Sequence, residues 1–244
     1  MRMREKLGTS SRLKAAKGSH PLAKCLLKSP SPRVPRYRAV LLDRDGVING
    51  LVYHQEAGVI DSPFTEAQFR LLPQVPQAIR LLNKLGLRVA VVSNQPGIAK
   101  GQLKPEILKS FDKALLAQVQ AAGGHIDRIF YCLHHPDAIV PSLRRRCQCR
   151  KPRTGLLRRA AKELNVRLSE CYMVGDGIPD LLAGVRAGCR TVFVRKWKCE
   201  ICQLKEAAHV RPALLAKDLW EASRLIRKEI LQAGRPQRRG LSGR

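Results

Sequence analysis

Polar side chains that could do chemistry directly follow three short apolar runs of this chain. The runs at residues 39–42, 87–92 and 172–175 are followed by Asp43 and Asp45, by Ser93 and Asn94, and by Asp176. Each run has the length and composition of a buried strand. Because the carboxyl ends of parallel strands meet at one edge of an open sheet, these side chains are expected to converge there although they are far apart in the sequence.

The elements that would position these residues alternate between strand and helix. Strands are predicted at 39–42, 87–92, 128–132, 172–175 and 191–194. Helices are predicted at 75–85, 105–122, 155–165 and 217–232, with a short one between the last two strands. Gly86 would end the first helix, and Pro105 would lie in the first turn of the second. This order predicts an α/β fold, a Rossmann-like parallel sheet with helices on both faces.

Length and composition divide the chain into one folded domain and two basic ends. The 244 residues suffice for one sizeable domain. We predict a basic, disordered extension at 1–38, the domain at 39–232 and a basic tail at 233–244. No apolar run could span a bilayer and no secretory signal is recognisable, so a cytoplasmic protein is expected. Residues 1–38 also have the composition of a mitochondrial or plastid transit peptide, which stands as the alternative.

The net charge of +27 raises the question of a nucleic-acid partner. Residues 1–38 alone hold eleven basic residues and one acidic residue, and 233–244 hold four basic residues and no acidic one. About half of the excess therefore lies outside the predicted domain. Aromatic residues, which would stack on bases, make up only 5% of the chain and do not interleave with the basic runs. Nucleic acid is therefore not the expected partner.

Four motifs of the chain together resemble a known enzyme family. They are LLDRDGVIN at 41–49, VVSNQPGIAKG at 91–101, CRKP at 149–152 and MVGDGIPDLLAGV at 173–185. Their content and order resemble the haloacid dehalogenase-like phosphatases, and within them the subgroup of heptose bisphosphate phosphatases and histidinol phosphatases. The resemblance covers roughly residues 38–195 and implies a Rossmann-like fold. The interval between the first two motifs is too short for a large cap domain.

The resemblance implies a role for each motif residue. Asp43 is the nucleophile that forms an aspartyl-phosphate, and Asp45 protonates the leaving group and then activates water. Lys151 offsets the developing negative charge. The substrate would be bound by residues of the second and third motifs, namely Ser93, Asn94, Gln95 and Arg150.

Magnesium is the cofactor that the resemblance implies, since two carboxylates beside a phosphate need a cation. Its protein ligands would be Asp43, the backbone carbonyl of Asp45, and Asp176. Asp180, about one helical turn after Asp176, is expected to support the ligands rather than to bind the metal. Gly177 and Pro96 depart from residues common in the subgroup, as does the segment after Asn49, so the substrate identity transfers less firmly than the chemistry.

A second group of residues has the spacing of a structural zinc site. In extended chain, residues i and i+2 point to the same side, so Cys132 and His134 would face Cys147 and Cys149 across a loop, with His135 pointing away. Three thiolates and one imidazole form a closed tetrahedral zinc site. Unliganded thiols or a disulfide are the alternatives. The resembled subgroup has such a loop directly before its Arg-Lys pair. The pair Cys199 and Cys202, with His209, is an incomplete set.

Two classes of function follow from these predictions. The first is a Mg²⁺-dependent phosphatase, with bound zinc, that acts on a small sugar bisphosphate of the heptose 1,7-bisphosphate type or, alternatively, on histidinol phosphate. The second is a nucleic-acid 3′-end phosphatase or a nucleic-acid-binding protein. The first is favoured, with a small phosphorylated substrate, no membrane partner, and a monomeric state that suits a capless domain.

Overall fold

The computed structural model describes residues 38–194 and 211–233. The strands are β1 (Ala39–Leu42), β2 (Val52–His54), β3 (Val59–Asp61), β4 (Arg88–Asn94), β5 (Arg128–Cys132), β6 (Cys171–Gly175), β7 (Arg190–Val194) and β8 (Leu214–Ala216). The α-helices are α1 (Val75–Lys84), α2 (Pro105–Ala121), α3 (Gly155–Glu163), α4 (Ile178–Ala187) and α6 (Leu219–Ala233). The predictions for the basic extension, for Cys199 and Cys202, and for residues 234–244 lie outside the described residues.

Six strands form one parallel sheet in the order β5-β4-β1-β6-β7-β8. The chain runs outward from β1 through β4 to β5 and then returns to β6 on the other side of β1. The strand order therefore reverses at β1, where open α/β sheets place their ligand sites. The backbone N–H of Asp43 donates to the carbonyl of Val174, 2.9 Å away, and ties the end of β1 to the end of β6.

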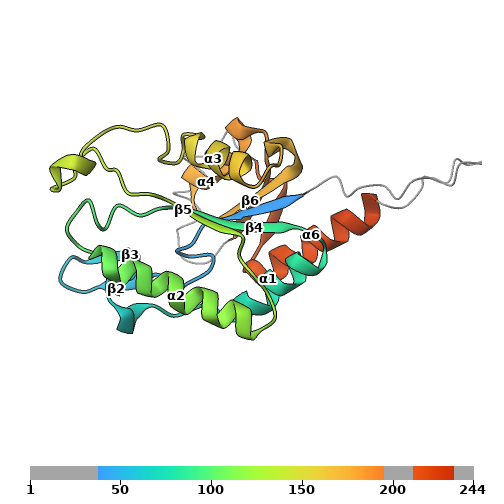
Figure 1. Cartoon of the computed structure of the whole chain (residues 1–244), viewed down its shortest axis with the longest axis horizontal. Helices are drawn as coiled ribbons and strands as arrows, with labels where there is room; N and C mark the ends of the chain where they lie inside the picture. The colour runs from blue at the N-terminus through green and yellow to red at the C-terminus, as the bar shows by residue number, and fades with distance from the viewer. Residues whose placement is uncertain (1–37, 195–210, 234–244) are drawn as a thin grey trace, which may run out of the picture. The chain divides into compact units, whose positions relative to one another are not determined.

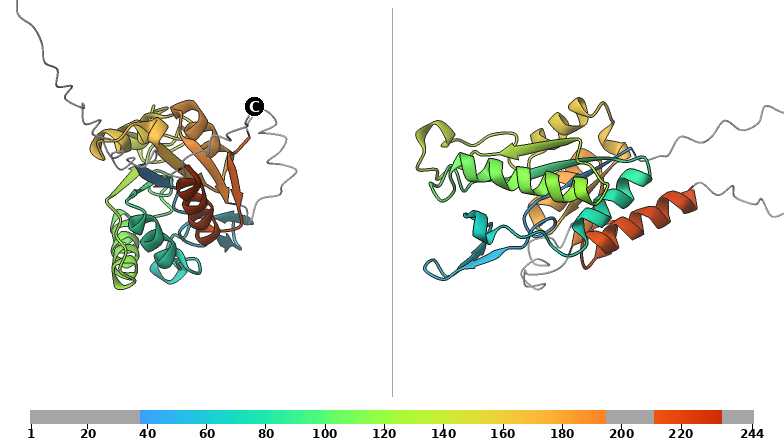
Figure 2. Two further views of the ribbon diagram at one scale, coloured as in Figure 1. Left: turned by 90° about the vertical axis from the view of Figure 1, so that its right-hand side faces the viewer. Right: turned by 60° about the horizontal axis from the view of Figure 1, so that its bottom comes forward.

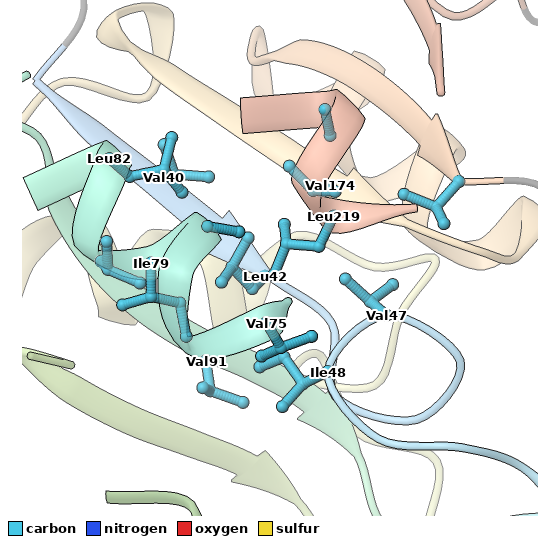
Figure 3. Packing of buried hydrophobic residues seen from close by; sticks show 14 of the residues in the cluster. Val40, Leu42, Val47, Ile48, Val75, Ile79, Leu82, Val91, Val174 and Leu219 are labelled. Atoms are coloured by element: carbon cyan, nitrogen blue, oxygen red, sulfur yellow. The ribbon is translucent and has the colours of Figure 1, made fainter. Parts of the chain in front are cut away.

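Helices cover both faces of this sheet because successive strand residues point to opposite sides. Val40 and Leu42 pack into a core with side chains of α1, α2 and α6, as Figure 3 shows for part of the cluster. Ala39 and Leu41 pack on the other face with side chains of α3 and α4. Figure 1 shows α3 and α4 on one side of the sheet and α1, α2 and α6 on the other. The predicted α/β class is thus confirmed.

Three short strands are absent from the sequence prediction. The β2–β3 hairpin lies between β1 and α1 and pairs Val52 with Asp61, while β8 adds a sixth strand beside β7. Each has three residues, too few for an apolar pattern to be recognised. In the described segment between β1 and α1, this hairpin and the turn η1 (Glu66–Gln68) take the place of a cap domain. The absence of a large cap domain, predicted from the short interval, is confirmed.

Two loops extend from the end of the sheet where the strands finish. The β2–β3 hairpin and the long loop after β5 project from this end in Figure 1 and in the right-hand view of Figure 2. The loop after β5 contains η2 (Pro141–Leu143) and leads to the third motif. No helix within the described ranges is long and apolar enough to cross a membrane.

Candidate active site

The carboxyl ends of β1, β4 and β6 surround a small cleft of about 190 Å³. Six of the predicted site residues line it: Asp43, Asp45, Ser93, Asn94, Lys151 and Asp176. Asp180 lines it too, and the hairpin side of the cleft contributes Leu51, Ile60, Asp61 and Ser62. Ser93 and Asn94 are the last two residues of β4 and do not follow it, because the strand runs two residues beyond its predicted end. The predicted convergence of these side chains is present in the structure.

Lys151 is the buried cation of the cleft. Only 3% of the residue is exposed, and its Nζ lies 2.9 Å from Asp43 Oδ1 and 2.5 Å from Asp180 Oδ1. The ammonium group also donates to the carbonyl of Val92, 2.8 Å away. Burial by itself lowers the pKa of Lys151, but the carboxylates of Asp180 and Asp43 outweigh it and raise the pKa above its usual range. Lys151 is therefore a permanent positive charge.

Three carboxylates lie close together in the cleft. Oxygens of Asp43, Asp176 and Asp180 lie within 4.8 Å of one another, whereas the side chain of Asp45 does not belong to the group. Burial and the neighbouring Asp43 raise the pKa of Asp180 to about 6, with Lys151 acting in the opposite direction. Carboxylate oxygens are ligands that Mg²⁺ prefers, so the donor set fits a hard divalent cation such as Mg²⁺. Asp180, expected to be a supporting residue, lies as close to this position as the predicted ligands.

Asp45 is held from several sides. Its carboxylate accepts hydrogen bonds from Arg44 (3.1 Å), Asn49 (2.8 Å), Gln95 (2.5 Å) and Ser62 (3.1 Å). Arg44 is fully buried. Burial opposes its charge, but Asp45 raises the pKa of the guanidinium above its usual range. The hydrogen bonds from Arg44 and Asn49 thus fix the rotamer of Asp45. The hydrogen bond from Ser62 connects the β2–β3 hairpin to the cleft.

Gly46 lets the loop after β1 pass directly beside Asp176. Its φ is +84°, and a Cβ there would lie 2.2 Å from Asp176 Oδ2. Replacing Gly46 with Ala is expected to lower the free energy of unfolding by about 2 kcal/mol or more, through both backbone strain and displacement of Asp176. Urea denaturation measures the loss, and Mg²⁺ titration should show weakened binding.

Gly58, at the hairpin turn, is the matched control for this substitution. Its φ is +63°, but a Cβ would meet nothing within 4 Å. Gly58→Ala should therefore show only the backbone cost and unchanged Mg²⁺ affinity. Equal Mg²⁺ affinity in the two variants would contradict the role given to Gly46.

Asn94 joins β4 to the loop that carries Lys151. Its Nδ2 donates to the carbonyl of Lys151, 3.1 Å away, and its Oδ1 accepts from the N–H of Lys151 at 3.0 Å. The amide oxygen and the amide nitrogen of Asn94 therefore both form hydrogen bonds with the main chain of Lys151. Lys151 Nζ also donates to the carbonyl of Val92 in the same strand, so β4 fixes both the backbone and the ammonium group of the lysine.

Two of the predicted substrate-binding residues do not line the cleft. Gln95 is 1% exposed and forms hydrogen bonds with Asp45, Ser93 and Arg44. Arg150 lies in a neighbouring cavity and donates to the carbonyl of His134 at 3.4 Å. Gln95 therefore reaches the cleft only through the side chains it contacts.

The predicted metal-binding residues of the long loop converge. The Sγ atoms of Cys132, Cys147 and Cys149 lie 3.2–3.5 Å apart, and His134 Nδ1 lies 3.4 Å from Cys149 Sγ and 3.9 Å from Cys132 Sγ. Ideal tetrahedral zinc would separate its sulfur ligands by about 3.8 Å and sulfur from nitrogen by about 3.5 Å. The set therefore fits zinc with small adjustments. The described cysteines are free thiols, and His135 is not part of the group.

We call residues 133–149, the loop between β5 and the third motif, the metal loop. It is also attached to the loop after β4. The N–H groups of Ile139 and Val140 both donate to the carbonyl of Ala99, at 2.9 and 3.1 Å. A Cβ on Gly101 would lie 2.5 Å from the side chain of Ile139. The second-motif loop and the metal loop therefore form one connected wall beside the cleft.

Comparisons with known proteins agree with this geometry. Residues 148–222 match the HAD-hydrolase-like family, and residues 50–184 match the polynucleotide kinase 3 phosphatase family. A protein of Yersinia pestis named D-glycero-beta-D-manno-heptose-1,7-bisphosphate 7-phosphatase is 37% identical over 161 residues, 66% of this chain and 81% of that protein. The protein of the same name from Photorhabdus laumondii is 35% identical over 191 residues, 78% of this chain and 97% of that protein. The chain belongs to the haloacid dehalogenase-like family.

A solved structure of this family supports the assignment. The crystal structure of D,D-heptose 1,7-bisphosphate phosphatase from B. bronchiseptica, complexed with magnesium and phosphate, matches with a TM-score of 0.66 at 29% identity. The match covers 79% of this chain and 99% of that one. The chain is therefore a phosphomonoester hydrolase of the haloacid dehalogenase-like family, and a relative of known structure binds Mg²⁺.

Sequence reasoning missed several contributors to this haloacid dehalogenase-like site. Asn49 and Ser62 were not identified, although both donate to Asp45. Asn49 could have been found, since it lies in the first motif, four residues after Asp45. Ser62 had no signal because it reaches the cleft only through the unpredicted hairpin.

Proposed function

We propose that this phosphatase hydrolyses one phosphate ester of a small sugar bisphosphate, at the 7-position of a heptose 1,7-bisphosphate, with Mg²⁺ as cofactor. The observation that carries the proposal is the Asp43–Lys151 ion pair of 2.9 Å inside a cleft that also holds Asp176 and Asp180. The named activity of relatives that are 35–37% identical supports the substrate class. The cleft volume of about 190 Å³ suits a phosphorylated sugar end rather than a large ligand.

In the proposed mechanism, a carboxylate oxygen of Asp43 attacks phosphorus. A bond forms between Asp43 and phosphorus while the bond from phosphorus to the sugar oxygen breaks. Water then attacks the aspartyl-phosphate, which releases inorganic phosphate and restores Asp43. Lys151 and the Ser93 hydroxyl stabilise the charge on the equatorial oxygens. Mg²⁺, held by Asp43, Asp176 and the backbone carbonyl of Asp45 or by Asp180, would neutralise the carboxylates and the phosphate.

Asp45 would move the protons in both steps. In the first step it gives a proton to the departing sugar oxygen, and in the second it takes one from the attacking water. Arg44 holds the carboxylate of Asp45 through hydrogen bonds. Gln95 and Asn49 keep the carboxylate directed along the cleft edge. We propose that Gln95 acts by this positioning.

Asn94 is proposed to hold Lys151 in place. Asn94→Ala removes both bonds to the Lys151 main chain and is expected to lower kcat about 10- to 100-fold, with a much smaller change in KM. Steady-state kinetics with a saturating small phosphate ester measures the effect.

Asn83→Ala is the matched control for Asn94→Ala. The amide oxygen of Asn83 also accepts a hydrogen bond from a backbone N–H, that of His125 at 2.8 Å. Asn83 lies at the end of α1 and does not line the cleft. Its substitution should leave kcat unchanged within about twofold. A rise in KM without a fall in kcat for Asn94→Ala would instead indicate the direct substrate contact expected from the sequence.

The Cys132–His134–Cys147–Cys149 cluster is proposed to hold a structural zinc ion. The fit rests on the four converging donors described above. Cys149 is followed directly by Arg150 and Lys151, so a fixed Cys149 limits the positions that both cations can take. Arg150 is proposed to meet the second anionic group of the substrate at the rim between the cleft and the neighbouring cavity.

A nucleic-acid 3′-end phosphatase is the second candidate, favoured by the match of residues 50–184 to the polynucleotide kinase 3 phosphatase family. That match begins after Asp43 and Asp45, and no aromatic side chain of the described residues lines the cleft. The deciding experiment is a substrate panel with Mg²⁺: heptose and hexose bisphosphates, histidinol phosphate and 3′-phosphorylated oligonucleotides. The highest kcat/KM is expected for a heptose bisphosphate. A preference for the oligonucleotides would reverse the two candidates.

A further inference from the structure

A second cavity lies beside the active-site cleft, and arginines dominate its lining. It has a volume of about 370 Å³ and is bordered by Arg145, Arg146, Arg150, Arg153 and Arg186. The remaining lining residues are His135, Pro136, Cys147, Lys151 and Pro152. We call this feature the basic cavity. It lies between the metal loop, the third motif and the C-terminal part of α4, and it shares only Lys151 with the cleft.

Among the described residues, no acidic side chain offsets the arginines of the basic cavity. None of the described lining residues is acidic, and within residues 38–194 and 211–233 none of the five arginines forms an ion pair. Guanidinium groups collected around one small space repel each other, and a bound anion relieves that repulsion.

Three of the arginines are already oriented by the main chain. Arg153 donates to the carbonyl of Cys147 at 2.7 Å, and Arg186 donates to the carbonyl of Pro152 at 3.2 Å. Arg150 donates to the carbonyl of His134. Each guanidinium has five N–H donors, so one such bond orients it while leaving the others available for a ligand. The basic cavity thus has an arrangement that is partly fixed before any ligand arrives.

We propose that the basic cavity is a binding site for a small anion with several phosphate groups, such as an oligophosphate. Arginine forms paired, charge-assisted hydrogen bonds with phosphate oxygens, and several arginines match several phosphates. The volume is at the lower end of small-molecule sites and exceeds the space that one phosphate needs. The basic cavity adjoins the phosphatase cleft and shares Lys151 with it, but four of its five arginines have no part in the catalytic proposal.

A soluble oligophosphate fits the basic cavity better than a nucleic-acid strand does. Binding of single strands uses aromatic side chains on which the bases stack. Among the lining residues in the described part of the chain there is no Phe, Tyr or Trp. The phosphates are therefore the recognised groups, and a hydroxyl-ended oligonucleotide tests the other source of the same chemistry.

The test is calorimetric titration of the full chain with tripolyphosphate, without Mg²⁺ and at fixed salt. Arg146→Gln/Arg153→Gln/Arg186→Gln is expected to weaken binding at least tenfold, since three charged hydrogen-bond donors are lost. Its kcat on p-nitrophenyl phosphate without tripolyphosphate should stay within about twofold of the wild type.

The matched control removes three exposed arginines elsewhere, in Arg80→Gln/Arg158→Gln/Arg227→Gln. It has the same net charge as the cavity variant and should lose less than about threefold in affinity. An equal loss in both variants would mean that binding follows net charge, which overturns the proposal. Undiminished binding in the cavity variant would place the anion elsewhere and overturn it as well. Binding of a hydroxyl-ended oligonucleotide but not of tripolyphosphate would also overturn it, in favour of a strand.

Discussion

Asp43→Asn is expected to lower kcat for phosphate-ester hydrolysis by at least about 10⁴-fold, because the amide cannot form the aspartyl-phosphate. The substitution keeps the shape of the side chain and removes one of three carboxylates whose oxygens lie within 4.8 Å of one another. The melting temperature should therefore be unchanged or higher. A loss of activity without a loss of stability is the signature of a nucleophile, as opposed to a structural residue at the end of β1. Steady-state kinetics and thermal denaturation of the same sample measure the two quantities.

Asp137→Asn is the control for this experiment. Asp137 also lies in a loop at the cleft end of the sheet, but its side chain is 88% exposed. Its kcat should match that of the wild type. Acid quenching of the wild type during turnover should trap a phosphorylated chain, and the Asp43→Asn variant should trap none. Turnover by Asp43→Asn above about 1% of the wild-type rate would refute the assignment of the nucleophile.

Loss of the proposed zinc ligand Cys147 is the second change with a large expected effect. The native chain should contain one zinc ion, and Cys147→Ser should lose it, with a fall in unfolding free energy on the order of several kcal/mol. Without the metal, the loop from Cys132 to Cys149 loses its anchor directly before Lys151. We therefore expect kcat to fall about 10- to 100-fold even at saturating Mg²⁺. Metal analysis by mass spectrometry, together with kinetics, measures both effects.

Cys189→Ala is the control, since Cys189 is buried against the sheet and is not part of the cluster. It should retain zinc and turnover. Native protein free of zinc after purification without chelators would contradict the zinc proposal. Full activity of a zinc-depleted Cys147→Ser protein would contradict the structural role proposed for the loop.

Much of the fold could be predicted because its signals are local. The five longer strands and the helices have apolar patterns of sufficient length, and their alternation indicates a parallel sheet. The hairpin, β8 and the last two residues of β4 could not be predicted. Three-residue strands have no recognisable period, and β4 continues through Ser93 and Asn94 because its pairing with β5 extends to Cys132.

The residue types of the site could be predicted from the sequence, but the hydrogen bonds between its residues could not. The position of Asp43 and Asp176 in one cleft follows from motifs at strand ends, and that of Lys151 follows from the resemblance to the family. That Asn94 bonds the main chain of Lys151, and that Gln95 bonds Asp45, depends on distances across loops that no spacing reveals. Arg150 was expected at the substrate, and the structure places it in a cavity with four other arginines.

The sequence by itself predicted the chemistry proposed for this protein, since a carboxylate that could act as nucleophile, a lysine and a Cys₃His set can be read from residue type and order. Only the tertiary structure decided which charged groups lie close enough to stabilise or repel one another. Asp180 pairs with Lys151, Arg44 is buried against Asp45, and the arginines of the metal loop meet Arg186 of α4 around one cavity. The physical reason is that electrostatic interactions depend on separation and burial in space, and these are fixed only when the loops pack against the sheet.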